Sequence, residues 1–470
     1  MPHKEDLQSF LERINHSAEK LKTLDKATVC THHDCDGITS GSIVAKALLR
    51  QGTKVDTITL KQLYSDDIDY LKKLDSWIVF TDFGSGYLPD LLNALGKNFT
   101  VIDHHQKGIG DFEYHINPKQ FGLDGDTHIS AAGIAYLVSK EMNPKNWDLS
   151  ALGIVGAIGD MQDSRFQKLE GMNHSILEEG VKDGMLEVKN DLRLYGRMSR
   201  PLTQYLMFST NPVLPDLTAN KDHCFSFLNG LGLELQTKEG YWRTYEDLDK
   251  SEKKNLVTAL IMHLNEHNSP EWKIKELFGE VYTLLKEEEK TPLRDAKEYS
   301  TLLNACGRHG KSKIGIQVCM GDREEYYEKA LGMLQEHRRQ LAQGITLMQE
   351  KGLEEFDHFY FFDAKKDIKD SIVGIVAGML YGSGVVKTDK PIVAFSRHDD
   401  GSIKVSARAT TELVRKGINL GLGLRETCQA LGQKAEGGGH KIAAGCRLDE
   451  NQKDSFLKKF DEKLGEQLRS

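Results

Sequence analysis

The first 105 residues alternate short apolar runs with amphipathic segments, and this alternation restricts the fold more than any other feature. Four runs rich in β-branched and aromatic residues predict strands, and apolar residues at helical spacing between them predict helices. Such an order forms an α/β domain, a mostly parallel sheet with helices on both faces. The predicted strands are Ala27–Thr31, Val55–Leu60, Trp77–Thr81 and Phe99–Ile102, and the helices are Ile38–Arg50, Asp66–Leu74 and Leu88–Leu95.

The rest of the chain predicts two further regions. Helices over Ser130–Lys140 and Leu149–Gly159 complete an N-terminal domain of residues 1–190. Residues 191–300 hold a helical pattern at Asn255–Leu264 and a charged amphipathic stretch at Glu271–Lys290, so we expect a helical insertion. Residues 301–470 predict a smaller α/β domain. Its expected elements are strands over Lys313–Cys319, His358–Phe362, Pro391–Ser396 and Ser402–Ala407, helices over Tyr326–Lys351 and Ile372–Leu380, and a turn at Asp399-Asp400-Gly401.

The composition is that of a soluble globular protein with reduced thiols. The longest apolar stretch, Ile372–Val386, is too short and too rich in glycine to span a bilayer, and the N-terminus lacks the apolar core of a signal peptide. Seven scattered cysteines without a C-x-x-C pair favour free thiols. We therefore expect a cytoplasmic protein without membrane contact. A net charge of −8 argues against wrapping duplex DNA, but it is compatible with a local basic groove.

Acidic and imidazole side chains follow three of the four predicted strands. Asp34 and Asp36 follow the first strand, Asp82 follows the third, and Asp103-His104-His105 follows the fourth. Ligands of open parallel sheets bind outside the carboxyl ends of the strands, so these residues are expected to converge on one edge. Carboxylates gathered there without cations would repel one another.

Divalent metal ions would remove this repulsion. Mixed carboxylate and imidazole ligands favour Mn²⁺, with Mg²⁺ or Co²⁺ as alternatives. Two ions about 3.5–4 Å apart would activate water and hold phosphoryl oxygens, which predicts hydrolysis at phosphorus. Taken singly, each aspartate could instead be a helix N-cap, and Asp36-Gly37 could be a turn. The recurrence at successive strand ends favours the metal site.

The same residues resemble the four ordered motifs of the DHH phosphoesterase superfamily. The motifs are His32-His33-Asp34-Cys35-Asp36-Gly37, Asp82, Asp103-His104-His105 and Gly159-Asp160. The resemblance implies that His105 contacts the scissile phosphate and acts in catalysis with Asp36 and Asp82. Only this resemblance identifies Asp160 as a site residue, because the sequence pattern around Asp160 otherwise indicates just the end of an apolar helix. The metal ligands that it implies are His32, Asp34, Asp36, Asp82, His104 and Asp160.

The C-terminal region narrows the resemblance to archaeal RecJ-like single-strand exonucleases. Gly437-Gly438-Gly439-His440 resembles the glycine-rich signature of the DHH-associated substrate domain, and consecutive glycines let backbone N–H groups approach an anion. Arg408 follows a predicted strand, where its guanidinium could hold a phosphate. The segment from Asn304 to Arg308 resembles the N-A-x-G-R element of RecJ-type nucleases. The implied substrate-binding residues are His105, Asn304, Arg308, Arg408, Gly438, Gly439 and His440.

The function expected from this resemblance is exonucleolytic hydrolysis of single-stranded DNA or RNA to mononucleotides. The single-stranded nucleic acid would pass through a cleft between the two α/β domains. A role in replication or repair would imply helicase or helicase-associated proteins as partners. Two rivals stay open: a nano-RNase or cyclic-dinucleotide phosphodiesterase, and a replication scaffold with secondary nuclease activity. Polarity and the choice between DNA and RNA are not specified by the sequence.

Overall fold

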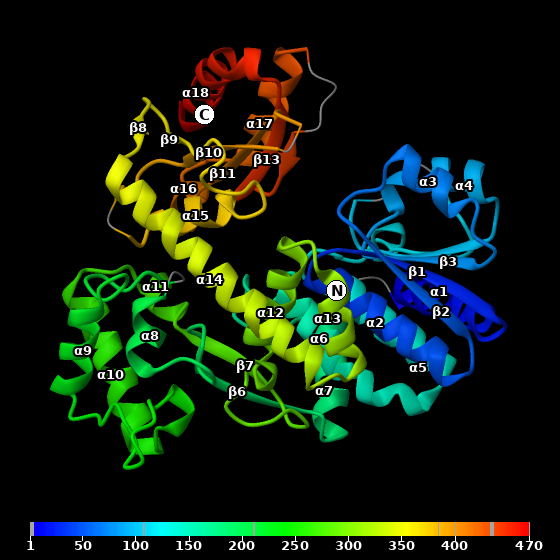
Figure 1. The fold of residues 1–470 in the computed structure, drawn as a ribbon, viewed down its shortest axis with the longest axis horizontal. Coiled ribbons are helices and arrows are strands. Elements are labelled where there is room, and N and C mark those ends of the chain that lie inside the picture. Colours follow the sequence, from blue (N-terminus) through cyan, green and yellow to red (C-terminus); the bar gives the residue numbers. More distant parts are fainter. Residues whose placement is uncertain are drawn as a thin grey trace. The chain divides into compact units, whose positions relative to one another are not determined.

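The computed structural model describes residues 4–106, 108, 110–209, 212–383, 385–398, 400–432 and 437–469. The chain divides into two compact units, each with its own core (Figure 1). The second unit is discontinuous in sequence, and residues 301–334, expected in the C-terminal region, fold with the first unit. The first unit is Met1–Tyr205 with Leu228–Leu334, and the second is Leu206–Phe227 with Gln335–Ser470.

A five-stranded parallel sheet forms the centre of the N-terminal part, as the alternating pattern predicts. The strand order is β2-β1-β3-β4-β5. Because Thr31 of the first strand pairs with Thr81, and Thr81 pairs with Ile102, the carboxyl ends of three neighbouring strands lie level. The strands are β1 (Lys26–His32), β2 (Lys54–Leu60), β3 (Trp77–Thr81), β4 (Phe99–Ile102) and β5 (His115–Ile116).

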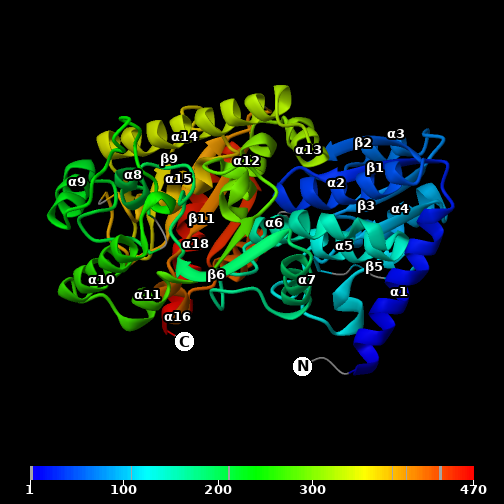
Figure 2. The ribbon, with the colours of Figure 1, turned by 90° about the horizontal axis from the view of Figure 1, so that it is seen from below.

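Helices cover both faces of this sheet because alternate strand residues point to opposite sides. Val29 and Val79 join the core under one set of helices, whereas Phe80 and Val101 join the core under the other set. Figure 2 shows α1 lying along α5 on the first face. The first set comprises α1 (Lys4–Lys22), α2 (Cys35–Arg50), α5 (Ala131–Met142) and α6 (Ser150–Gly159), and the second comprises α3 (Ser65–Leu71) and α4 (Leu88–Leu95).

The region expected as a helical insertion also contains a strand. Phe278–Leu284 lies within the stretch predicted as charged and amphipathic, but its Val-Tyr-Thr-Leu run pairs antiparallel with the strand Leu186–Leu192. Cross-strand packing of β-branched and aromatic residues outweighs the flanking charges here. The elements are α7 (Gly171–Lys182), β6 (Leu186–Leu192), α8 (Leu202–Met207), α9 (Lys221–Gly230), α10 (Lys250–Glu266), α11 (Glu271–Lys275) and β7 (Phe278–Leu284).

The prediction of a strand over Lys313–Cys319 is wrong, because this segment is a helix. Ser312, Ile316 and Cys319 are buried at helical spacing. Gly315 has no side chain, and a Cβ there would lie 3.2 Å from Ile38 and Leu303, so the helix lies close to its neighbours. A short apolar run does not by itself distinguish a strand from a buried helix. The helices are α12 (Ala296–Arg308), α13 (Ser312–Met320) and α14 (Glu325–Lys351), the last as predicted.

The C-terminal region forms a six-stranded mixed sheet of order β12-β13-β11-β10-β9-β8, which confirms a smaller α/β domain. Strands β9 and β10 are parallel, and the other neighbours are antiparallel. Of the predicted turn, Asp399 lies outside the described residues, while Gly401 has φ +86° and donates to His398. The elements are β8 (Glu354–Glu355), β9 (Tyr360–Asp363), α15 (Val373–Leu380), β10 (Ile392–Arg397), β11 (Ile403–Arg408), α16 (Thr411–Arg415), α17 (Leu420–Ala430), β12 (Gly438–Gly439), β13 (Ala443–Leu448) and α18 (Lys453–Arg469).

All seven cysteines are free and buried. Among the helices of the described part of the chain, none combines the length and the apolar character that crossing a membrane requires.

Candidate metal centre

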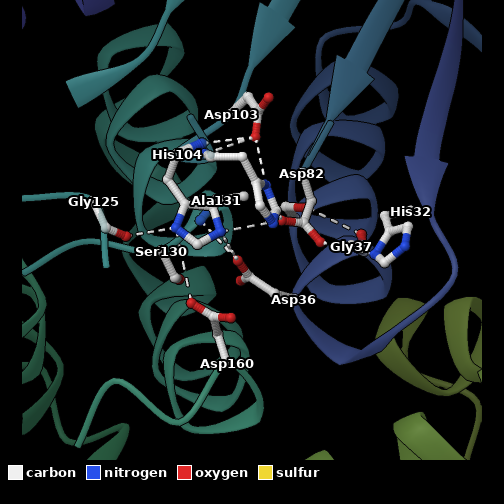
Figure 3. A network of polar contacts seen from close by, with 12 residues as sticks. His32, Asp36, Gly37, Asp82, Asp103, His104, Gly125, Ser130, Ala131 and Asp160 are labelled. Atoms are coloured by element: carbon white, nitrogen blue, oxygen red, sulfur yellow. Dashed lines mark hydrogen bonds and ion pairs between the residues drawn. The ribbon is translucent and has the colours of Figure 1, made fainter. Parts of the chain in front are cut away.

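Three strand ends and one helix end bring the predicted metal ligands together (Figure 3). His32 ends β1, Asp82 follows β3, His104 follows β4, and Asp160 caps the C-terminus of α6. Within the described residues, the aspartates and histidines form three overlapping groups whose candidate ligand atoms lie within 4.8 Å of one another. The groups are His32, Asp34 and Asp82; Asp36, His104 and Asp160; and Asp82, His104 and His105.

The first group joins the end of β1 to the end of β3. His32 Nδ1 lies 3.0 Å from Asp34 Oδ1 and 3.3 Å from Asp82 Oδ2. Asp34 is also the N-cap of α2, where its Oδ1 accepts from the Gly37 N–H at 3.1 Å. The N-cap role of Asp34 is compatible with the predicted ligand role, because a capping oxygen leaves the second oxygen of the carboxylate available.

The second group is built around the N-terminus of α5. The backbone N–H groups of Ala131 and Ala132 donate to the two carboxylate oxygens of Asp36 at 2.8 and 2.9 Å. Gly156 of α6 makes room for this carboxylate, since a Cβ there would lie 2.6 Å from Asp36 Oδ1. A helix N-terminus stabilises negative charge, so the orientation of Asp36 is fixed by the backbone.

His104 is oriented with one ring nitrogen toward the carboxylates. Its Nδ1 lies 2.6 Å from the carbonyl oxygen of Gly125 and donates to it. In the neutral imidazole, Nε2 therefore carries the lone pair, and it lies 3.3 Å from Asp82 Oδ1 and 3.6 Å from Asp36 Oδ2. A backbone acceptor that fixes the tautomer in this way is a common feature of histidines that ligate metals.

Within the described residues, three buried polar atoms of the centre make no hydrogen bond of good geometry, although carboxylate oxygens lie 3.0–3.6 Å from the two imidazole nitrogens. They are His32 Nδ1, Asp82 Oδ1 and His104 Nε2, and all three face the space between the carboxylates. Asp82 also adopts a left-handed backbone with φ +66°, which is costly for a residue other than glycine. Unpartnered buried atoms and local strain are unfavourable unless a ligand interacts with them. This donor set fits divalent cations.

The charges of the centre raise several pKa values. Burial raises the pKa of Asp36 well above its ordinary value, and the charge of Asp82 adds to the shift. Burial likewise raises the pKa of Asp160 to about 6. Burial alone would lower the pKa of His104, but the carboxylates of Asp82, Asp160 and Asp36 raise it. Without cations, the group therefore holds protons, as expected for crowded carboxylates.

His105 is placed differently from the other histidine of the pair. Its side chain is 57% exposed, and its Nδ1 lies 2.9 Å from the buried Asp103. Burial opposes the charged form, but the hydrogen bond and charge of Asp103 raise the pKa of His105 to about 9. His105 is thus an imidazolium at neutral pH. Asp103 also accepts the backbone N–H groups of His104, His105 and Ser85, so it fixes the whole turn.

Some supporting residues were missed by sequence reasoning. Gln162 donates to Asp160 Oδ2 at 2.9 Å and to the carbonyl of Gly125 at 3.0 Å, and Asn173 donates to Gln162. His33 Nδ1 lies 3.1 Å from His32 Nε2, and burial lowers the pKa of His33 to about 4. Their only sequence signal is proximity to the motifs, because these contacts arise from the tertiary fold.

The predicted substrate residues fall into two sets. Asn304 and Arg308 lie in the first unit, on α12 beside the metal centre. Asn304 Oδ1 accepts from the Cys35 N–H at 3.0 Å, so it holds the loop that carries Asp34 and Asp36. Burial lowers the pKa of Arg308, while the neighbouring charge of Asp34 raises it.

The second set lies at one edge of the C-terminal sheet. Arg408 ends β11 opposite Ala443 of β13, and Gly438 and Gly439 form β12 on the other side of β13. The His440 N–H donates to the Ala443 carbonyl at 2.8 Å, and the side chain of His440 is exposed. The fold therefore brings Arg408 and the glycine-rich segment to the same strand.

Three family models match the chain in order: the DHH family N-terminal domain over residues 26–154, the DHH-CID domain over residues 194–278 and the DHHA1 domain over residues 357–466. The uncharacterized protein MJ0831 of Methanocaldococcus jannaschii is 32% identical over 476 residues, with 96% of this chain and 99% of that protein covered.

Two solved structures share the fold at low identity. The exonuclease RecJ bound to manganese has a TM-score of 0.57 at 14% identity, covering 96% of this chain and 94% of its own. CDC45 from Entamoeba histolytica has a TM-score of 0.60 at 12% identity, covering 99% of each chain. The chain therefore belongs to the DHH family, with the RecJ-like combination of a DHH and a DHHA1 domain.

Proposed function

We propose that this chain is a divalent-metal-dependent phosphodiesterase that hydrolyses single-stranded nucleic acid from an end and releases mononucleotides. The observation that carries the proposal is the arrangement of His32 Nδ1, Asp82 Oδ1 and His104 Nε2. These buried atoms face one another among carboxylates and make no hydrogen bond of good geometry within the described residues. Such a donor set is suited to cations and not to hydrolysis by a nucleophilic side chain.

Six residues would hold two cations, and Asp82 lies between the two histidines of this set. One oxygen of Asp82 faces His32, and the other faces His104. Oxygen and imidazole donors suit Mn²⁺, with Mg²⁺ or Co²⁺ as alternatives, and the similar RecJ structure holds manganese. Bound cations would supply a water of lowered pKa and positive charge next to the phosphoryl oxygens. The proposed ligands are His32, Asp34, Asp36, Asp82, His104 and Asp160.

The protein's own groups would orient the ligands and the phosphate. For His32 Nδ1 to be a ligand, His32 Nε2 must carry the proton and donate to the neutral His33. Asp103 holds Nδ1 of His105, so the exposed imidazolium can donate from Nε2 to a phosphate oxygen. This contact would stabilise charge that develops on the phosphate during hydrolysis.

Nucleic acid is the substrate class that the remaining cationic and glycine-rich groups favour. Arg308 and Asn304 beside the centre would contact the phosphate next to the scissile one. Arg408, Gly438, Gly439 and His440 would hold a further phosphate through a guanidinium, backbone N–H groups and an exposed imidazole. A local set of donors of this kind is compatible with the acidic net charge of −8.

The test is digestion of 5′- and 3′-labelled single-stranded DNA and RNA of 30 nucleotides with and without Mn²⁺. We expect Mn²⁺-dependent release of mononucleotides. Asp82→Asn should lower the rate by more than about 100-fold, because loss of even an outer-shell partner of a metal ligand costs 10–100-fold. Asp90→Asn, an exposed aspartate of α4, is the matched control and should leave the rate unchanged.

Two outcomes would favour the rival functions. Faster turnover of dinucleotides than of 30-nucleotide strands would indicate a nano-RNase or cyclic-dinucleotide phosphodiesterase. Binding of single strands without any hydrolysis would indicate a scaffold. Full Mn²⁺-dependent activity in Asp82→Asn would contradict the site as assigned.

A further inference from the structure

A pocket of about 330 Å³ opens beside the metal centre, within the first unit. His32, Asp82, Asp103 and His105 form the wall next to the centre. The far wall comes from the segments that follow β2, β3 and β4. Its residues are Lys61, Gln62, Leu63, Phe83, Gly84, Gly86, Tyr87 and Gln106.

The far wall combines an apolar surface with polar groups at its rim. Leu63 is buried, and the half-buried rings of Phe83 and Tyr87 pack against the core between the sheet and helices α3 and α4. The Phe83 ring makes an edge contact with Phe80 at a centroid distance of 5.7 Å, which fixes its orientation. Rings held from behind in this way offer a rigid surface to a planar ligand. Lys61, Gln62 and Gln106 are exposed and add one ammonium and two amide groups.

Glycine at position 86 borders the pocket and has open space next to it. Gly86 lies in the pocket wall, its φ is not positive, and a Cβ built there would meet no atom within 4 Å. Its neighbour Gly84 differs, because its φ is +120° and an added Cβ would lie 3.1 Å from Val101. A larger side chain at position 86 would therefore be tolerated by the backbone and would occupy space next to the pocket.

We propose that this pocket receives the nucleoside of the terminal nucleotide, with its base against Phe83 and Tyr87. The inference rests on the proposed function, because it places this nucleoside beside the phosphate that the metal centre would bind. A phosphate against the far wall is disfavoured, since Lys61 is the one cationic side chain among the described residues that line it. The volume lies near the lower end of the ~300–1,000 Å³ of ligand pockets, which suits a single nucleoside and the release of one nucleotide at a time.

Contact with the face of a base tolerates any sequence, because every base has such a face. The pocket should therefore distinguish a base from no base but not one base from another. This expectation can be measured with strands that carry an abasic tetrahydrofuran residue at the labelled end. Wild-type protein with Mn²⁺ should cleave the normal end with a kcat/KM about 10-fold or more above that of the abasic end.

Two variants report on the pocket by different means. Gly86→Leu should fill it, and Tyr87→Ala should remove one ring. In both, kcat/KM on the normal end should fall toward the abasic value, while kcat/KM on the abasic end should stay within about 2-fold of wild type. Thermal unfolding would show that both variants fold. Tyr70→Ala, which removes a 55% exposed tyrosine of α3 outside the pocket, is the matched control and should leave both rates unchanged.

The outcomes separate the two proposals. Absence of Mn²⁺-dependent hydrolysis of every strand by wild-type protein would overturn the proposed function, and the pocket assignment with it. Hydrolysis of normal and abasic ends at equal rates would overturn the pocket assignment alone. An equal loss of kcat/KM on normal and abasic ends in Gly86→Leu and Tyr87→Ala would also overturn the pocket assignment, because a pocket for the base affects only the normal end.

Discussion

Three residues of the metal centre are held in place by other groups of the fold. Helix α5 holds Asp36 through two backbone N–H groups, the carbonyl of Gly125 fixes the tautomer of His104, and Asp103 holds His105. The ligand atoms are thereby positioned before any cation arrives. Preorganisation of this kind lets a site hold charges close together that would otherwise turn toward solvent.

His115 illustrates how a buried residue behind the centre links stability to pH. It is fully buried on β5, where Ser85 Oγ lies 2.8 Å from its Nε2. Burial lowers the pKa of His115 to about 4, below the ~6.5 of an unfolded chain. The unfolded chain therefore binds a proton first as the pH falls, and the folded state loses stability between about pH 6.5 and pH 4.

We predict that the free energy of unfolding of the wild-type protein falls between pH 7 and pH 5 by about 2 kcal/mol more than that of His115→Asn. Urea titrations at both pH values would measure the difference. His16→Asn, which replaces a half-exposed histidine of α1, should behave like the wild type. An equal loss in wild type and His115→Asn would show that His115 does not stay neutral in the folded protein.

At the scale of elements, helix α12 supports the metal loop from outside the parallel sheet. Asn304 accepts from the Cys35 N–H, and a Cβ on Gly307 would lie 2.0 Å from the carbonyl oxygen of His33. The helix can approach the loop this closely only because position 307 is glycine. Helix α12 therefore sets the position of the residues from His33 to Asp36.

Gly307→Ala should push the loop away from α12 and lower the free energy of unfolding by about 1–3 kcal/mol, the usual cost of overpacking. It should also weaken Mn²⁺ binding, since Asp34 moves with the loop. Gly332→Ala is the matched control: position 332 is an exposed helical glycine with open space, so alanine there should stabilise by up to about 1 kcal/mol. Chemical denaturation and Mn²⁺ titration measure both effects. Equal stability of the two variants would contradict this packing.

The sequence predicts best those elements whose own residues form a recognisable local pattern. The strands Trp77–Thr81 and Phe99–Ile102 have the predicted bounds, because buried parallel strands are short runs of apolar residues between turn residues. Lys313–Cys319 was mistaken for a strand because its helical face is defined by contacts with α2 and α12 and not by polar residues. The strand Phe278–Leu284 was missed for the corresponding reason, since its partner lies almost a hundred residues earlier.

The candidate site was also only partly predictable, because some of its contacts join residues that are far apart in the sequence. Strand-end placement predicts Asp34, Asp36, Asp82 and the 103–105 segment, because strand ends meet at one edge of a parallel sheet. Asp160 sits at the end of an apolar helix, and only the family resemblance singled it out. Gln162 gives no sequence signal beyond its proximity to Asp160, because its contact with Asp160 depends on how the turn after α6 folds back.

At the level of the whole molecule, the first unit is built from two segments of the chain, and a segment of the second unit lies between them in the sequence. Leu206–Phe227 folds with the second unit, although residues on both sides of it fold with the first. In the second unit this segment packs on Gly382, where a Cβ would lie 2.9 Å from Thr218. The region matched by the DHH-CID model, residues 194–278, thus contributes to both units. Contacts so distant in sequence leave no periodic pattern, so the sequence could not place this division.

We propose that the carboxylates and imidazoles that converge at this site hold divalent cations. Counting of bound Mn²⁺ by electron paramagnetic resonance during titration of the full chain tests it most directly. We predict two Mn²⁺ ions per wild-type chain and loss of both in the double variant Asp36→Asn/Asp82→Asn, because Asp82 belongs to two of the three ligand groups and Asp36 belongs to the third. A wild-type chain that binds no more Mn²⁺ than this double variant would contradict the account.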